Sequence, residues 1–199
     1  DYLTVTYSIL KSVTTYDGPE TEEKAQVKYD YNFDGDKIKT VTVFGYNATT
    51  DILETSTTYR ADTNTGVYAT VTYSILKSVT FYTGNETEEK ALLTQNYDYL
   101  GASIKTSTVF SYTADALTSS VTYRGQVSKA QAEASQLAVN PVAITNTRKS
   151  VTTYLGNEGA DKASFTYDFN FDGDQIKTVT DFDYTDNELK TSTTYRADA

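Results

Sequence analysis

Three near-copies of one unit follow one another along the chain, and this repetition limits the possible folds more than any other feature. The copies occupy residues 11–60, 77–124 and 149–196, so their starts are 66 and then 72 residues apart. Tyr29–Tyr46 and Tyr167–Tyr184 are identical at 14 of 18 positions. Such repetition predicts an array of similar supersecondary units, in which each unit packs on its neighbours.

The repeats also define the domain organisation that we predict. Repeat unit 1 spans residues 1–66, repeat unit 2 spans 67–126, an inserted helix spans 127–140, and repeat unit 3 spans 141–199. Because the chain opens and closes at equivalent points of the repeat, we expect it to be part of a longer array. A complete mature protein of three units is the alternative.

Alternation of apolar and polar residues predicts β-strands in every copy, and the abundance of Tyr, Phe and Thr favours them. In repeat 1, one predicted strand places on a single face Ala25, Val27, Tyr29, Tyr31 and Phe33. The next strand places together Ile38, Thr40, Thr42, Phe44 and Tyr46. A third places together Leu53, Thr55, Thr57 and Tyr59, and Thr4–Tyr16 precedes them as one long strand or two strands joined by a bulge.

Short turns connect these predicted strands. Asp34-Gly35 separates two of them, and a glycine provides the positive φ that tight hairpin turns require. Short connections make neighbouring strands antiparallel, so each unit is predicted to be a four-stranded meander, or five-stranded with the strand between copies. The predicted fold class is therefore all-β, with tandem antiparallel meander repeats in a sandwich- or solenoid-like rod.

Substitutions between copies indicate which strand face meets solvent. Val43 and Gly45 of repeat 1 correspond to Asp181 and Asp183 of repeat 3, so their face is predicted to be wet. The opposite, aromatic face is predicted to form the core or to mediate assembly between units, because cross-strand aromatic pairs stabilise sheets. Its residues are Tyr29, Tyr31, Phe33, Phe44, Tyr46, Tyr59, Tyr97, Tyr99, Phe110, Tyr112, Tyr123, Tyr167, Phe169, Phe171, Phe182, Tyr184 and Tyr195.

One short segment departs from the strand pattern. Val127–Val139 has apolar residues at helical spacing, namely Val127, Ala130, Ala134 and Leu137. Ser128 is a suitable N-cap, and Asn140-Pro141 ends the run. We therefore predict one short inserted helix that covers an apolar strip or marks a junction between units.

Composition excludes several classes of function. The chain has no Cys, His, Met or Trp, which removes disulfides, thiolate or imidazole metal sites and histidine-based acid–base schemes. Its net charge of −10 opposes binding to nucleic acid or to anionic membranes. No apolar run is long enough for a membrane-spanning helix. Three near-copies of one surface also argue against a catalytic site, so we predict that the protein is not an enzyme and uses no cofactor.

An acidic pattern raises the question of calcium. It resembles the first half of a D-x-N-x-D-G calcium loop, but the bidentate glutamate that completes such loops is absent, since Val41 takes that place. Alternation explains the spacing fully, with polar side chains on the wet face of a strand that enters an Asp-Gly turn. The weak calcium candidates are Asp30, Asn32, Asp34 and Asp36, with Asp168, Asn170, Asp172 and Asp174.

Two asparagines match the N-glycosylation sequon. Asn47-Ala48-Thr49 and Asn85-Glu86-Thr87 both lie in predicted turns, which makes Asn47 and Asn85 candidate acceptors of surface glycans.

The segments Tyr31–Gly35 and Ile38–Thr42 together resemble the bacterial YD-type (Rhs-like) repeat, with its aromatic-acidic start, a glycine and a Val-Thr tail. Asn32 stands where that motif has Asp, and Gly35 is separated from Ile38 by one extra residue. The resemblance covers about a dozen residues of each copy. It implies extended β-structure in a large bacterial surface or secreted protein.

These observations predict a structural role. We expect an extracellular or cell-surface repeat segment of a bacterial surface or filament protein that self-assembles with further copies through aromatic β-faces and strand edges. An adhesin-type or carbohydrate-binding β-repeat module is the alternative, and it requires exposed aromatic residues at equivalent positions of all three copies. An intracellular location also stays open, because a chain without Cys is compatible with either redox compartment.

Overall fold

The computed structural model describes residues 8–137 and 142–197. In this part of the chain the structure is nearly all β, with one short helix. The elements are β1 (Ser12–Asp17), β2 (Lys24–Tyr31), β3 (Ile38–Tyr46), β4 (Leu53–Ala61), β5 (Tyr73–Thr83), β6 (Lys90–Tyr97), β7 (Ile104–Thr113), β8 (Ala116–Arg124), α1 (Lys129–Ser135), β9 (Arg148–Leu155), β10 (Lys162–Phe169), β11 (Ile176–Thr185) and β12 (Glu188–Arg196).

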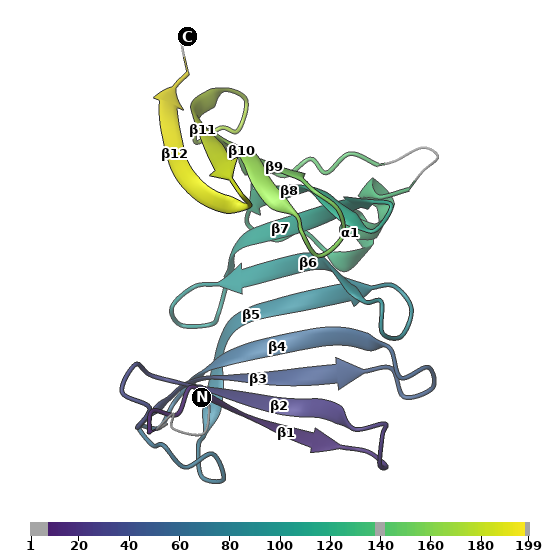
Figure 1. The fold of residues 1–199 in the computed structure, drawn as a ribbon, viewed down its shortest axis with the longest axis vertical. Coiled ribbons are helices and arrows are strands. Elements are labelled where there is room, and N and C mark those ends of the chain that lie inside the picture. Colours follow the sequence, from purple (N-terminus) through teal and green to yellow (C-terminus); the bar gives the residue numbers. More distant parts are fainter. Residues whose placement is uncertain (1–7, 138–141, 198–199) are drawn as a thin grey trace. The chain divides into compact units, whose positions relative to one another are not determined.

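The hydrogen-bonded order of the strands follows the chain from β1 to β12, and each copy of the repeat supplies four of them (Figure 1). Strands β1–β4 come from repeat 1, β5–β8 from repeat 2 and β9–β12 from repeat 3. The prediction of an all-β antiparallel meander with one short inserted helix is thereby confirmed.

The described chain divides into two compact units. The first contains β1–β5 together with the loop Tyr97–Ser103, and the second contains Ala91–Asn96 of β6 together with β7–β12. The pairing of β4 with β5, which joins repeats 1 and 2, lies inside the first unit, and the pairing of β8 with β9, which joins repeats 2 and 3, lies inside the second.

A β-bulge decides which residues of repeat 1 share a face. Asp30 of β2 pairs with Thr40 and Tyr31 pairs with Ile38, so Lys39 is the extra residue. The bulge reverses the alternation, because side chains beyond it point to the opposite side. Val41 therefore joins Tyr31 and Ile38 in one buried cluster.

The prediction of a single aromatic inner face was wrong for this reason. That prediction assumed regular alternation from Ile38 through Thr40 and Thr42, without the extra residue at Lys39. Pairing of Tyr29 with Val41 and of Thr42 with Lys28 places Tyr29 on the face of Val41 and places Thr42 on the opposite face. The aromatic residues that follow Thr42 at period two lie on that opposite face, half-buried: Phe44 and Tyr46, with the counterparts Phe110, Tyr112, Phe182 and Tyr184.

The segment after repeat 1 covers the buried cluster. We call residues 62–72 connector 1. Tyr31 donates a hydrogen bond from its hydroxyl to the Gly66 carbonyl over 2.9 Å, and the Ile38 amide donates to the Thr65 carbonyl over 2.8 Å. Val71 of the connector packs against the same cluster. Connector 1 thus supplies apolar and backbone partners that a one-layer sheet lacks on its own.

The segment after repeat 2 covers the equivalent region of repeat 2 itself. We call residues 125–147 connector 2, of which 138–141 lie outside the described residues. Gln95 donates from its amide nitrogen to the Val127 carbonyl over 2.8 Å, and both residues are buried. Ser107, the counterpart of Val41, is fully buried and binds connector 2 through its hydroxyl. Connector 1 and connector 2 therefore cover equivalent regions of repeats 1 and 2 through different contacts.

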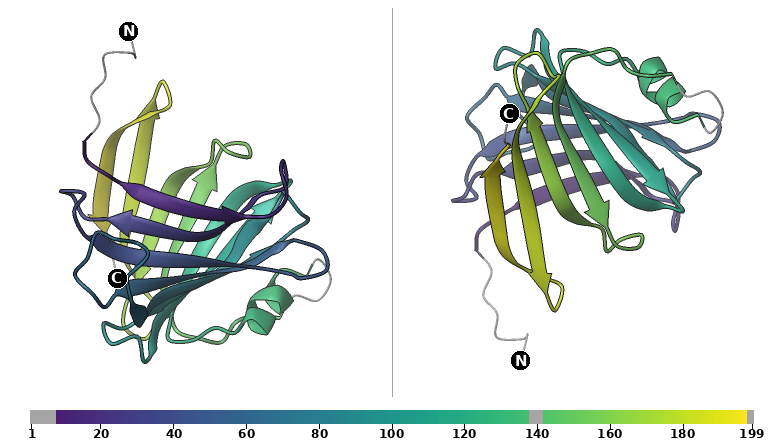
Figure 2. Two further views of the ribbon diagram at one scale, coloured as in Figure 1. Left: turned by 90° about the horizontal axis from the view of Figure 1, so that it is seen from below. Right: turned by 90° about the horizontal axis from the view of Figure 1, so that it is seen from above.

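Connector 2 carries the helix α1, which Figure 2 shows on the long connection between β8 and β9. The predicted N-cap is confirmed: the Gln131 amide donates to Ser128 Oγ over 3.2 Å, and the Ser128 amide donates to Gln131 Oε1 over 2.9 Å. The predicted apolar face was partly wrong, because Val127 and Ala132 are buried whereas Ala130 and Leu137 are exposed. The helix ends at Ser135, before its spacing reaches Leu137. The predicted stop at Asn140-Pro141 lies outside the described residues.

Repeat 3 is the most open of the three. Ile176, the counterpart of Ile38, is 42% exposed where Ile38 is 4% exposed, and every residue of β12 is exposed. The aspartates that replace Val43 and Gly45 in this repeat, Asp181 and Asp183, therefore reflect the openness of repeat 3 alone. They do not mark a wet face common to all copies.

The part of the chain that the structure describes contains no helix of the length and apolar character needed to cross a membrane.

Candidate functional site

The most regular feature of the protein is the junction at which the last strand of one repeat pairs with the first strand of the next. At the first junction, β4 pairs with β5, with Thr57 opposite Val79 and Thr58 opposite Ser78. At the second, β8 pairs with β9, with Val121 opposite Val151 and Thr122 opposite Ser150. These positions are equivalent in the repeat, and a register shift follows them at the same place in both junctions. The two junctions therefore share one register.

An arginine reaches across each junction to the Gly-containing loop of the next repeat. Arg60 donates to the carbonyl of Asp98 in that loop over 3.3 Å and to the carbonyl of Leu76 in β5 over 3.1 Å. Arg124 donates to the carbonyls of Asn170 and Phe171, both over 3.2 Å. Hydrogen bonds from a charged donor are stronger than neutral ones, so each arginine is an effective clamp.

The same arginines lie over an exposed aromatic ring of that loop. The guanidinium carbon of Arg60 is 5.4 Å from the ring centre of Tyr99, and that of Arg124 is 5.2 Å from the ring centre of Phe171. A cation at this distance from a ring face is attracted to its π electrons. In repeat 1 the equivalent ring, Phe33, has Lys11 of the same repeat at 5.1 Å.

A serine–tyrosine hydrogen bond is the second shared contact. Ser56 of β4 and Tyr82 of β5 are 3.0 Å apart at their hydroxyl oxygens, and the corresponding distance from Ser120 of β8 to Tyr154 of β9 is 3.1 Å. Both serines are buried, so their hydroxyls need a partner within the protein.

A carboxylate that accepts a backbone amide is the third shared contact. The Leu53 amide donates to Glu89 over 2.9 Å, and the Leu117 amide donates to Asp161 over 3.1 Å. The hydrogen bond from Leu53 holds the pKa of Glu89 below its ordinary value, against a smaller, opposite effect of burial. The folded junction thus favours the ionised form of this carboxylate.

Acid is expected to weaken the first junction through Glu89. A carboxyl group whose pKa is lowered on folding adds stability above its unfolded value, near 4.5, and that contribution is lost as the pH falls through the folded value. We expect Glu89→Gln to lose less stability than the unaltered chain between about pH 7 and about pH 3 in urea titrations. Glu88→Gln, at the exposed neighbouring position, should retain the original pH profile. Equal acid sensitivity of the Glu89→Gln chain and the unaltered chain would contradict this role of Glu89.

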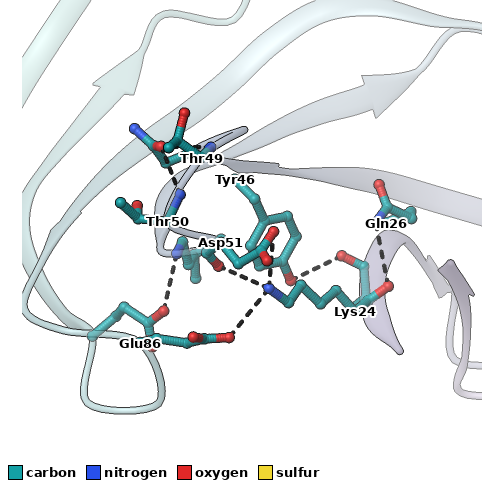
Figure 3. Close-up of polar contacts among 11 residues, drawn as sticks. Lys24, Gln26, Tyr46, Thr49, Thr50, Asp51 and Glu86 are labelled. Atoms are coloured by element: carbon teal, nitrogen blue, oxygen red, sulfur yellow. Dashed lines mark hydrogen bonds and ion pairs between the residues drawn. The ribbon is translucent and has the colours of Figure 1, made fainter. Parts of the chain in front are cut away.

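A cluster of polar contacts centred on Lys24 lies beside the first junction (Figure 3). The Lys24 ammonium is 3.2 Å from an Asp51 carboxylate oxygen and 3.3 Å from a Glu86 carboxylate oxygen, and it lies 5.7 Å from the ring centre of Tyr46. Burial lowers the pKa of Lys24, but the hydrogen bonds with Asp51 and Glu86 outweigh it and the pKa is raised. Lys24 therefore links the turn between β3 and β4, which contains Asp51, to the turn between β5 and β6, which contains Glu86.

The same lysine contact recurs in repeat 3. Lys162 donates to the backbone and side-chain oxygens of Asn187 over 3.1 and 2.7 Å and lies 5.4 Å from the ring centre of Tyr184. The recurrence indicates a structural role for this lysine.

An acidic hollow of about 780 Å³ surrounds Lys24. Carboxylates line it, including those of Glu22, Glu23, Asp51 and Glu86. Within residues 8–137 and 142–197, no group of three or more acidic side chains is arranged to hold a metal ion. Among its carboxylates, those of Asp51 and Glu86 pair with Lys24, and that of Glu89 accepts the Leu53 amide.

The weak calcium candidates form loops that are closed by their own hydrogen bonds. Asn32 Oδ1 accepts the amides of Asp36 and Lys37 over 3.1 and 3.2 Å, and its amide nitrogen donates to Asp36 over 2.7 Å. Asn170 does the same with Asp174, and Thr178 donates to Asp168. Asp30 is paired with Lys28 at 2.7 Å, and Asp34 and Asp172 are exposed. Asn32 with Asp36, and Asn170 with Asp174, thus close the turn of their loop.

The glycine of each loop has a definite steric role. Gly101 has φ +71°, and a Cβ on it would lie 2.6 Å from the backbone nitrogen of Leu76, in the first strand of the same repeat. Gly35 and Gly173 are in the same situation. Only glycine allows the strand to pass so close to the loop.

The two sequon asparagines lie in turns, as predicted. Asn47 Oδ1 accepts the amides of Thr49 and Thr50 over 3.0 and 3.1 Å, and its amide nitrogen donates to Glu54 over 2.9 Å. Asn85 is exposed. Glycosylation of either residue stays a prediction.

The aromatic residues predicted as core are distributed over three environments. Tyr31 and Tyr123 are buried. Four are exposed, so for them the core interpretation was wrong: Phe33, Tyr99, Phe171 and Tyr195. The first three lie in the loop beyond the end of the strand, where alternation no longer applies. The others are half-buried, namely Tyr29, Phe44, Tyr46, Tyr59, Tyr97, Phe110, Tyr112, Tyr167, Phe169, Phe182 and Tyr184.

The junction contacts were not predicted from the sequence. The signal was present, because all three copies end in Tyr-Arg and all three have an acidic residue directly before a Lys-Ala pair. Neither feature resembles a known motif, and their roles depend on residues of the neighbouring repeat.

No family model matches the chain, and a search of curated proteins finds no relative. Membership of the YD-type repeats stays a prediction.

Proposed function

We propose that this chain is a structural array of β-repeats from an extracellular bacterial surface or filament protein, in which repeats join edge to edge. The observation that most supports this proposal is the recurrence of the same three contacts and the same strand register at both junctions. A repeated joining device serves to build length, whereas a catalytic site is built once from dissimilar parts. We propose no catalytic role.

Immunogold electron microscopy of the source cells, with antibodies raised against this chain, tests the proposal. We expect label on surface layers or fibres. Label confined to the cytoplasm would overturn the extracellular structural role. A protein with unrelated repeats, labelled in the same sections, serves as the control.

A carbohydrate-binding or adhesin module is the second candidate, and one observation favours it. The loop aromatics Phe33, Tyr99 and Phe171 are 83%, 79% and 80% exposed at equivalent positions of the three repeats. Each has a cation near its ring, and aromatic rings on a surface are suited to stacking against sugars. A glycan array probed with the chain and with the triple variant Phe33→Ala, Tyr99→Ala, Phe171→Ala tests it. Binding that only the unaltered chain shows would support this candidate, and the absence of binding by either would reject it.

A further inference from the structure

The outer edges of β1 and β12 carry the two complementary halves of the junction. β1 is the first strand in the hydrogen-bonded order and β12 is the last. An edge strand presents free amides and carbonyls to any strand that can pair with it. The side chains of these edges can be compared, position by position, with those of the two internal junctions.

The β12 edge carries the same junction residues that β4 and β8 contribute to the two internal junctions. Arg196 corresponds to Arg60 and Arg124, Ser192 to Ser56 and Ser120, and Leu189 to Leu53 and Leu117. At the second junction Ser120 is buried, whereas Ser192 and Arg196 are exposed. Tyr195 is 58% exposed, while its counterpart Tyr123 is 9% exposed.

The β1 edge carries the residues that β5 and β9, with the loops of their repeats, contribute to the internal junctions. Glu23 corresponds to Glu89 and Asp161, Tyr16 corresponds to Tyr82 and Tyr154, and the loop of Asn32 and Phe33 corresponds to the loops that Arg60 and Arg124 clamp. Tyr16, Ile9 and Leu10 are exposed at this edge. Lys11 donates to the Phe33 carbonyl over 3.4 Å, which is the place that an incoming arginine would take.

We propose that a second copy of this chain joins here head to tail, with its β1 paired antiparallel to β12. This inference rests on the proposed structural function and names its partner and register. The internal junctions place Thr193 opposite Val13, Thr194 opposite Ser12 and Thr191 opposite Thr15 of the incoming copy. Arg196 binds the carbonyls of Asn32 and Phe33, Ser192 binds the hydroxyl of Tyr16, and the Leu189 amide donates to Glu23.

Charge and apolar surface favour a second copy over an unrelated partner. The partner must present an acidic residue, a tyrosine hydroxyl and two loop carbonyls in one register, and the β1 edge of this chain has all of them. The exposed apolar residues also occur in pairs that become covered together, since Tyr195 faces Leu10 in this register just as Tyr123 faces Arg148 and Tyr59 faces Leu76.

Disulfide trapping between two different variants tests the register. The chain has no cysteine, so introduced thiols have no competitors. Residues directly opposite in antiparallel strands are close enough for a disulfide. We expect a mixture of the Thr193→Cys and Val13→Cys chains to form covalent heterodimers on mild oxidation. A mixture of Thr193→Cys and Asp17→Cys, which is out of register on the same strand, should form few. Equal yields from both mixtures would overturn the proposal.

Sedimentation velocity over a range of concentrations tests the contacts. The unaltered chain is expected to form species larger than 22.0 kDa as its concentration rises. Arg196→Ala should weaken association at least about tenfold, because two charge-assisted hydrogen bonds are lost. Lys190→Ala, on the same strand but outside the junction set, should leave it unchanged. A chain that stays monomeric at every concentration would overturn head-to-tail docking, while surface labelling in cells would still support the structural role of the array.

Discussion

Ile38→Ala is expected to destabilise the first compact unit by about 2–5 kcal/mol, as measured by denaturant unfolding. Ile38 is 4% exposed and lies in the cluster with Tyr31 and Val41 that connector 1 covers. Truncation removes buried methyl groups and leaves a cavity, because the backbone hydrogen bond from Ile38 to Thr65 holds the connector in place.

Repeat 3 offers a matched control for this substitution. Ile176 is the equivalent residue, is likewise followed by Lys-Thr-Val-Thr, and is 42% exposed. Ile176→Ala should therefore cost at most about 1 kcal/mol. If both substitutions cost the same, the connector would not be the source of the difference.

Ser107→Val is expected to cost about 2–5 kcal/mol, although valine is the natural residue at this position of repeats 1 and 3. Ser107 Oγ donates to the Gly125 carbonyl over 2.8 Å and accepts the Val127 amide over 2.9 Å. Ser107 and Val127 are fully buried, so valine leaves an amide and a carbonyl of connector 2 without these partners. An unsatisfied buried group costs about 1–3 kcal/mol.

Ser164→Val is the control for the change in side chain itself. Ser164 lies half-buried in β10, where a β-branched residue suits the strand, and we expect a change of at most about 1 kcal/mol. Thermal unfolding of the two variants at one pH compares them directly. A Ser107→Val chain as stable as the unaltered one would mean that connector 2 is held by other contacts.

Strand number, strand order and the helix cap could be predicted because they depend on local sequence. Alternation located the strands, short turns made them antiparallel, and Ser128 at the start of the apolar run indicated the N-cap. The facing of β3 could not be predicted, since the extra residue at Lys39 becomes visible only when β2 and β3 are paired. A single such residue exchanges the two faces of a strand.

Residues that act across repeats were also beyond prediction. The partners of Arg60 are Leu76 and Asp98, and the partner of Arg124 is a loop 46–47 residues later in the chain. Nothing in the local pattern around Tyr-Arg distinguishes a clamp from a solvated strand end. Exposure of Phe33, Tyr99 and Phe171 depends on where β2, β6 and β10 end, and strand ends are the least predictable boundaries.

Near-identical repeats carry a risk during folding, because a strand of one copy can pair with the wrong copy. Contacts between a connector and its own repeat can reduce such mispairing. Connector 1 bonds to the tyrosine hydroxyl of repeat 1 through Gly66, whereas connector 2 requires the hydroxyl of Ser107, which the valines of repeats 1 and 3 cannot provide. Repeat 2 also has a tyrosine, Tyr97, at the position of Tyr31, so the hydroxyl contact of connector 1 does not distinguish these two repeats. The contact with Ser107, in contrast, makes connector 2 fit repeat 2 better than repeats 1 and 3. A contact that only one repeat can provide favours the native position of connector 2, and with it the native order of the strands that connector 2 joins.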